Sequence, residues 1–70
     1  MRPPYLTRME GERQELAYKI EALAGWITNE PHFNALVPDE QREMRDQLFH
    51  MRGYAAALDR RIERALARHQ

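Results

Sequence analysis

Two runs of apolar residues with alternating three- and four-residue spacing constrain the fold of this 70-residue chain more than any other feature. Such spacing is typical of a heptad repeat, in which one stripe of an α-helix is apolar and faces a partner. The seam residues are Leu6, Met9, Leu16, Ile20, Leu23 and Ile27 in the first run, and Met44, Leu48, Met51, Ala55, Leu58, Ile62 and Ala65 in the second. The pattern predicts one amphipathic helix in each half of the chain.

The start of the first helix is indicated by two competing signals. Thr7 followed by Glu10 fits a capping box, in which each side chain bonds the other's backbone N–H. The dipeptide Pro3-Pro4 can equally open the helix two or three residues earlier, because proline suits the first helical position. We expect the first helix at about residues 7–28.

A connection rich in helix-breaking residues follows over 29–37. Within it we expect one short helical turn that places Phe33 and Leu36 over the end of the paired helices. The second helix is expected at about 38–68, opened by a proline and by acidic residues that favour the positive end of a helix dipole.

The two seams match each other when the chain folds back on itself. Leu6 then faces Ala65 and Ile27 faces Met44. Each seam residue between these pairs also faces a seam residue of the other helix, with no shift in register along the hairpin. The sequence therefore predicts an all-α antiparallel helical hairpin. Arg13 alone interrupts the seam, either as a tolerated defect or as a polar contact that fixes the register.

Two helices bury only one narrow stripe each, and a chain without cysteine has no disulfide to stabilise it. We expect a single domain over residues 1–70 whose copies associate, as a homodimeric four-helix bundle or as a larger ring. Residues off the seam that supply a second face are Ala17, Ala24, Trp26, Phe49, Tyr54, Ala56 and Leu66.

Catalysis and metal binding are not expected. The chain has no serine and no cysteine, and its glycines are isolated and do not form a phosphate loop. The three histidines, His32, His50 and His69, are too scattered to share a metal, and Asp46 with His50 is interpreted as an exposed helix pair. The sequence predicts a protein that is not an enzyme and needs no cofactor.

Charge and hydropathy limit the classes of partner that the chain is expected to bind. Eleven basic residues balance eleven acidic ones, which makes nucleic acid an improbable ligand even for the basic stripe Arg60, Arg64 and Arg68. The sequence contains neither an apolar stretch of membrane-spanning length nor a secretory leader, so we expect a cytoplasmic protein. The loop end is acidic and the terminal end is basic.

One flank beside the seam combines polar side chains with aromatic ones. In the hairpin it brings Glu12 near Arg61, Lys19 near Tyr54, and Trp26 near Gln47. Aromatic rings next to lysine and arginine are what a nucleotide-like ligand requires. Packing between copies explains the same residues without a ligand, so both interpretations stay open here.

The order of these motifs resembles a family of short, mostly uncharacterised bacteriophage proteins. The resemblance covers about residues 8–62, and those proteins usually carry Phe at the position of Trp26. The residues that carry it are Arg8, Met9, Glu12, Leu16, Lys19, Ile20, Leu23, Trp26, Ile27, Phe33, Leu36, Gln47, Met51, Tyr54, Leu58, Arg61 and Ile62.

The resemblance implies a phage accessory protein that acts in the infected bacterium against host defence. Some such proteins are oligomeric sponges for nucleotide immune signals, and others block a defence protein directly. Our leading hypothesis is a sponge for an anionic nucleotide-type signal; the alternative is an inhibitor that uses a helix face or the acidic loop end. The expected ligand contacts are Arg8, Lys19, Trp26, Tyr54 and Arg61.

Overall fold

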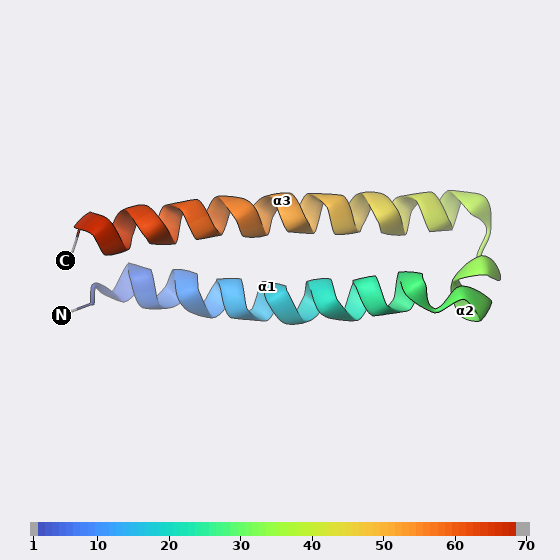
Figure 1. Cartoon of the computed structure of the whole chain (residues 1–70), viewed down its shortest axis with the longest axis horizontal. Coiled ribbons are helices and arrows are strands. Elements are labelled where there is room, and N and C mark those ends of the chain that lie inside the picture. Colours follow the sequence, from blue (N-terminus) through green and yellow to red (C-terminus); the bar gives the residue numbers. More distant parts are fainter. Residues whose placement is uncertain (1, 69–70) are drawn as a thin grey trace.

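The computed structural model describes residues 2–68 as three helices: α1 (Pro4–Thr28), α2 (Glu30–Asn34) and α3 (Pro38–Arg68). Figure 1 shows α1 and α3 lying side by side and antiparallel, joined through the short α2, with both ends of the chain at the opposite end of the rod. The hairpin measures 50 × 15 × 14 Å. The predicted all-α antiparallel hairpin is therefore confirmed.

Helix α1 begins at Pro4, three residues before the start expected from the capping box. Pro3 is the N-cap residue in an extended conformation, and no side chain caps this end. The carbonyl of Pro3 accepts hydrogen bonds from the N–H groups of Leu6 (3.1 Å) and Thr7 (3.4 Å). The capping-box start was wrong, and the proline start is the one adopted, because a proline at the first helical position needs no N–H partner.

The connection is held by hydrogen bonds at both of its ends. At the end of α1 the Asn29 N–H donates to the Trp26 carbonyl at 3.1 Å, and the Thr28 hydroxyl donates to the carbonyls of Ala24 (3.1 Å) and Gly25 (3.0 Å). At the other end, the Gln41 side-chain amide donates to the Leu36 carbonyl at 2.8 Å. Within the connection, the Phe33 N–H donates to the Asn29 carbonyl at 3.0 Å and the Leu36 N–H donates to the Phe33 carbonyl at 3.1 Å.

Phe33 of α2 is the plug that the sequence predicts. Its side chain is 2% exposed, and Leu36 beside it is half-buried. The Arg45 guanidinium of α3 lies 4.9 Å from the centre of the Phe33 ring, a cation–π contact on the outer side. The loop end of the hairpin is thus closed by an aromatic ring that α3 covers.

Six of the buried apolar residues form two clusters along the seam, and Leu48 and Phe33 are buried outside these clusters. The first contains Leu6, Met9 and Ala65, packed against Ile62 and Leu66; the second contains Leu16, Ala55 and Leu58, packed against Ile20 and Met51. Leu6 shares a cluster with Ala65, and Ile20 shares one with Met51, as the fold-back register predicts. The register is confirmed.

Arg13 lies between the two clusters and is half-buried. Its guanidinium binds the Asp59 carboxylate through two nitrogens, with distances of 2.7 Å from Nε to Oδ1 and 3.3 Å from Nη2 to Oδ2. This hydrogen bond raises the pKa of Arg13. The residue that interrupts the seam is therefore a polar cross-link between α1 and α3 at a defined register.

A large surface stays exposed in one hairpin. Its accessible area is 5461 Å², compared with roughly 4,600 Å² for a compact monomer of this mass. Several large apolar side chains face outward: Tyr5, Tyr18, Trp26, Val37, Phe49 and Tyr54. Within residues 2–68, no helix is both long enough and apolar enough to cross a membrane.

Candidate ligand-binding site

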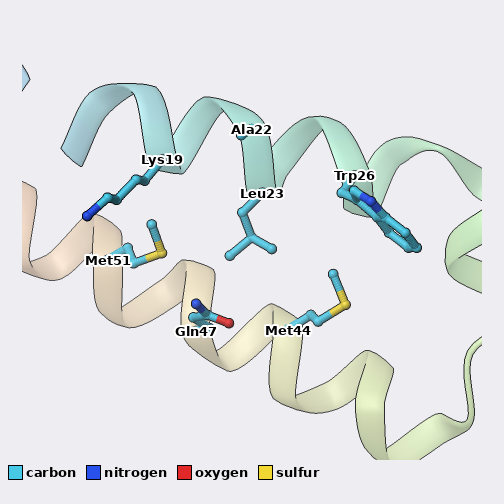
Figure 2. Close-up of a pocket in the computed structure, with 7 residues that line it drawn as sticks. All are labelled: Lys19, Ala22, Leu23, Trp26, Met44, Gln47 and Met51. Atoms are coloured by element: carbon cyan, nitrogen blue, oxygen red, sulfur yellow. The ribbon is translucent and has the colours of Figure 1, made fainter. Parts of the chain in front are cut away.

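A pocket of about 370 Å³ opens between α1 and α3 in the half of the hairpin nearer the connection. Its volume lies within the range of small-molecule sites. Figure 2 shows Leu23 extending from α1 toward α3, with Lys19 and Trp26 at opposite ends of the pocket. The lining residues are Lys19, Ala22, Leu23 and Trp26 from α1, and Met44, Gln47 and Met51 from α3.

Helical spacing explains why these residues meet. Positions 19, 22, 23 and 26 follow the three- and four-residue steps that place side chains on one face of a helix, and positions 44, 47 and 51 do the same on α3. Each face combines seam residues with their immediate neighbours. The pocket therefore lies at the edge of the core, where the apolar seam meets the polar flank.

The floor and the rim of the pocket differ in chemistry. Leu23, Met44 and Met51 are half-buried seam residues that form an apolar floor. In Figure 2 the Lys19 side chain extends past Met51 at one end, and the Trp26 indole lies at the other. Lys19 and Trp26 are seven residues apart on α1, so their backbone positions are separated by about 10 Å along the helix axis.

Trp26 is partly held by the connection. Its ring centre lies 6.3 Å from that of His32 in α2, and the two planes are tilted by 51°. The residue is still 46% exposed, so a large part of the indole is open to a ligand. The contact with His32 restricts the orientation of the ring at the edge of the pocket.

The lining combines three polar side chains with an apolar surface. Its polar groups are the Lys19 ammonium, the Gln47 amide and the Trp26 indole N–H, and none of the lining residues carries a carboxylate, imidazole or hydroxyl group. A cation, an amide and an aromatic ring are suited to an anion that also has a flat, hydrogen-bonding ring system. The Met44 and Met51 side chains adapt to irregular ligand shapes because thioether chains are flexible.

The structure brings two of the five predicted contact residues together in this pocket, Lys19 and Trp26. Arg61 lines a different pocket, nearer the chain ends. Arg8 and Tyr54 are exposed and line neither, although Tyr54 lies one helical turn beyond Met51 on α3. Shared flank position was therefore insufficient to predict a shared pocket.

Five lining residues were not among the predicted contacts: Ala22, Leu23, Met44, Gln47 and Met51. Leu23, Met44 and Met51 were assigned to the core by their heptad positions, and they contribute both to the core edge and to the pocket floor. Gln47 was placed near Trp26 by the antiparallel register, and the two residues do line one pocket. That register was the available signal for including Gln47.

The histidines do not form a metal site within residues 2–68, where no group of three or more His, Cys, Asp or Glu side chains is placed to hold an ion. His50 and Asp46 are both exposed on α3, and the His50 ring meets the edge of Phe49 with ring centres 5.5 Å apart. His69, also considered as a ligand, lies outside the described residues.

Comparison with known proteins identifies a family that covers most of the chain. A family model described as Sequestin matches residues 3–64, a stretch that includes all of α1 and α2, most of α3 and every residue of the pocket. No curated protein and no solved structure matches the chain.

Proposed function

The chain belongs to the Sequestin family, and we propose that it is a non-enzymatic binding protein that sequesters a small anionic molecule of nucleotide type. The family's name indicates a sequestering binding protein. The class of ligand is our own inference. A single observation carries it: the pocket that sets a lysine and a half-exposed tryptophan at opposite ends of an apolar floor.

Each rim residue has a role in this proposal. Lys19 pairs with a phosphate, Trp26 stacks on a base, and the Gln47 amide bonds the polar edge of the base or the sugar. The separation of about 10 Å between Lys19 and Trp26 along α1 is compatible with a base and a phosphate at opposite ends of one nucleotide. A ligand that extends beyond the pocket would reach Tyr54, the next aromatic side chain on α3.

Self-association belongs to the same proposal. One hairpin leaves an exposed surface larger than expected for its mass, and its pocket is open to one side. A second copy that packs on this side would enclose the ligand and bury the exposed apolar surface of Trp26 and Tyr54. Arg8, which lies outside the pocket of one hairpin, would then enter as a contact contributed between copies.

The biological setting follows from the resemblance to short phage proteins. In that setting the protein acts in the cytoplasm of an infected bacterium and counters host defence by removing a nucleotide signal. No turnover is needed, because a sponge lowers the free ligand concentration by binding alone. The protein must then be at least as abundant as the signal it removes.

Binding measurements on pocket variants test the proposal. Native mass spectrometry of the gently purified protein reports retained ligands and subunit number, and calorimetry with AMP, ADP and cyclic di-AMP measures affinity. Trp26→Ala should weaken binding about 5- to 150-fold, the range for loss of one base-stacking contact. Lys19→Gln should also weaken binding.

Two exposed residues outside the pocket provide matched controls, Tyr18→Ala for the aromatic change and Arg52→Gln for the loss of charge. Both should leave affinity within about twofold of the parent. Equal losses in the pocket variants and the controls would contradict the site. Failure of every nucleotide to bind, with none retained on purification, would contradict the ligand class.

The alternative function is inhibition of a host protein through an exposed helix face. Phe49 supports it, because this residue is 73% exposed on α3 and lines no part of the pocket. Under this alternative, Phe49→Ala abolishes capture of the host protein and Trp26→Ala leaves it unchanged. Pull-down from bacterial extract with the two variants distinguishes the two functions.

A further inference from the structure

A second pocket, of about 200 Å³, lies near the chain ends and far from the connection. Arginine dominates its lining. The residues are Tyr5 and Met9 from α1, and Arg61, Arg64, Ala65 and Arg68 from α3. None of the residues that line it carries a carboxylate, so the local charge is strongly positive.

The three arginines meet because of their spacing. Arg61, Arg64 and Arg68 follow steps of three and four residues, which aligns them on one face of α3. That face packs against the first turns of α1, and Met9 and Ala65 are buried there in the same core cluster. The three arginines therefore line one hollow whose base is formed by buried apolar residues.

Two carboxylates at this end of the hairpin are already engaged by other arginines, and Glu12, which the register places near Arg61, forms no ion pair with it among the described residues. Glu10 pairs with Arg2, and Asp59 accepts the two hydrogen bonds from Arg13. Among the described side chains, no ion pair joins Arg61, Arg64 or Arg68 to a carboxylate. Three like charges close together repel one another, and a shared anion relieves that repulsion.

Helix-dipole stabilisation accounts for only one of the three. Arg68 alone lies in the last turn of α3, where a positive charge favours the helix end. Arg61 and Arg64 lie before the last turn of α3, so the helix dipole does not account for their positions. Across the pocket, the start of α1 has no acidic residue in its first turn and no side-chain cap, so it adds positive potential.

We propose that this arginine pocket is a separate site for a phosphate group, either inorganic phosphate or a phosphate of a larger molecule. The planar guanidinium fork matches phosphate oxygens through paired hydrogen bonds. The pocket is smaller than typical drug-sized sites and therefore suits one or two phosphates. It is distinct from the Trp26 pocket, because Arg61 is ten residues from Met51, about 15 Å along α3.

Calorimetry and NMR titration of the full chain with inorganic phosphate, at low salt and without sulfate, test the site. Arg61→Gln and Arg64→Gln should each weaken phosphate binding at least about tenfold. Arg60→Gln removes the same charge from the same helix outside the pocket, and it should change affinity by less than about twofold. Circular dichroism checks that each variant keeps its helices.

Two results would overturn the proposal. One is equal weakening by Arg60→Gln, which would mean diffuse attraction to a basic helix. The other is no saturable binding of phosphate or AMP at the arginines. If Arg64→Gln instead changes only the number of subunits, the occupant is a carboxylate of a second copy and the phosphate site is wrong.

Two competition measurements with inorganic phosphate and AMP identify the source of the phosphate. If Trp26→Ala leaves the affinity for inorganic phosphate unchanged, and phosphate and AMP bind simultaneously, the site takes free phosphate. If AMP displaces inorganic phosphate and its binding depends on Arg64, the site takes a phosphate carried by a nucleotide. Nucleotide binding in the Trp26 pocket is measured with Trp26→Ala, and phosphate binding in the arginine pocket is measured with Arg64→Gln. Failure of the phosphate site therefore leaves the proposed function intact, and failure of the proposed function leaves the phosphate site intact.

Discussion

Leu58→Ala should be among the most destabilising single substitutions in this chain. Leu58 is 0% exposed and lies in the cluster with Leu16 and Ala55. Loss of three carbon groups costs about 2.4 kcal/mol of transfer free energy, at about 0.8 kcal/mol each. A residual cavity of about 40 Å³ adds about 1 kcal/mol, because small neighbours such as Ala55 cannot fill it.

The expected loss is therefore about 3 kcal/mol, from a total stability of roughly 3.5 to 10 kcal/mol for a chain of this length. For a domain this small, each kcal/mol shifts the melting temperature by about 4 to 8 °C, so Leu58→Ala should lower Tm by about 12 to 24 °C. Thermal and urea unfolding followed by circular dichroism measure the change. Every variant is compared at one protomer concentration, because self-association is linked to stability.

Leu66→Ala is the matched control, since it makes the same chemical change on the same helix. Leu66 is only half-buried against the first cluster, so its loss should cost about 1 to 1.5 kcal/mol. The reasoning would be refuted if Leu58→Ala cost less than about 1 kcal/mol, or if the two variants were equally destabilised. Either result would mean that the seam around Leu58 is not the centre of the core.

Two further predictions concern positions outside the apolar core. A double-mutant cycle with Arg13→Gln and Asp59→Asn should give a coupling free energy of about 0.2 to 1 kcal/mol. Because the pair is partly exposed, this coupling free energy should fall in high salt. Zero coupling would contradict the role of the pair as a cross-link between the helices. Since the pKa of Arg13 is raised, the contribution of the pair on the alkaline side should be fully present up to the ordinary arginine pKa and should be lost only as the pH rises beyond it. Gly53→Ala should raise the free energy of unfolding by about 0.5 to 1 kcal/mol in the urea assay. The reason is that Gly53 lies inside α3, and no neighbouring atom is near an added methyl group. Destabilisation by this substitution would indicate that another copy packs against Gly53.

Most of the fold could be predicted because a heptad pattern fixes which stripe of each helix is buried. Leu6 with Ala65 and Ile20 with Met51 follow from that pattern and from a fold-back about one centre. Phe33 could also be placed, since it is a large apolar side chain within a short connection. The start of α1 was harder, because Pro4 and Thr7 both favour a helix start and only one can be first.

The candidate sites were predicted only in part. Periodicity shows which side of a helix a residue occupies, and on that basis Lys19, Trp26 and Arg61 share one flank. It does not show how far apart along the rod two residues can be and still meet. The structure assigns Lys19 and Trp26 to one pocket and Arg61 to another, because a lining side chain reaches only its near neighbours.

The sequence by itself determined the helical hairpin and its register, because the spacing of apolar residues is a one-dimensional property of the chain. Only the tertiary structure decided that Arg13 turns toward Asp59 and that Arg61, Arg64 and Arg68 gather beside Met9. These outcomes depend on the separation of α1 and α3 and on the directions of individual side chains. Neither quantity is encoded in the repeat, because the same heptad pattern is compatible with many side-chain conformations at its edges.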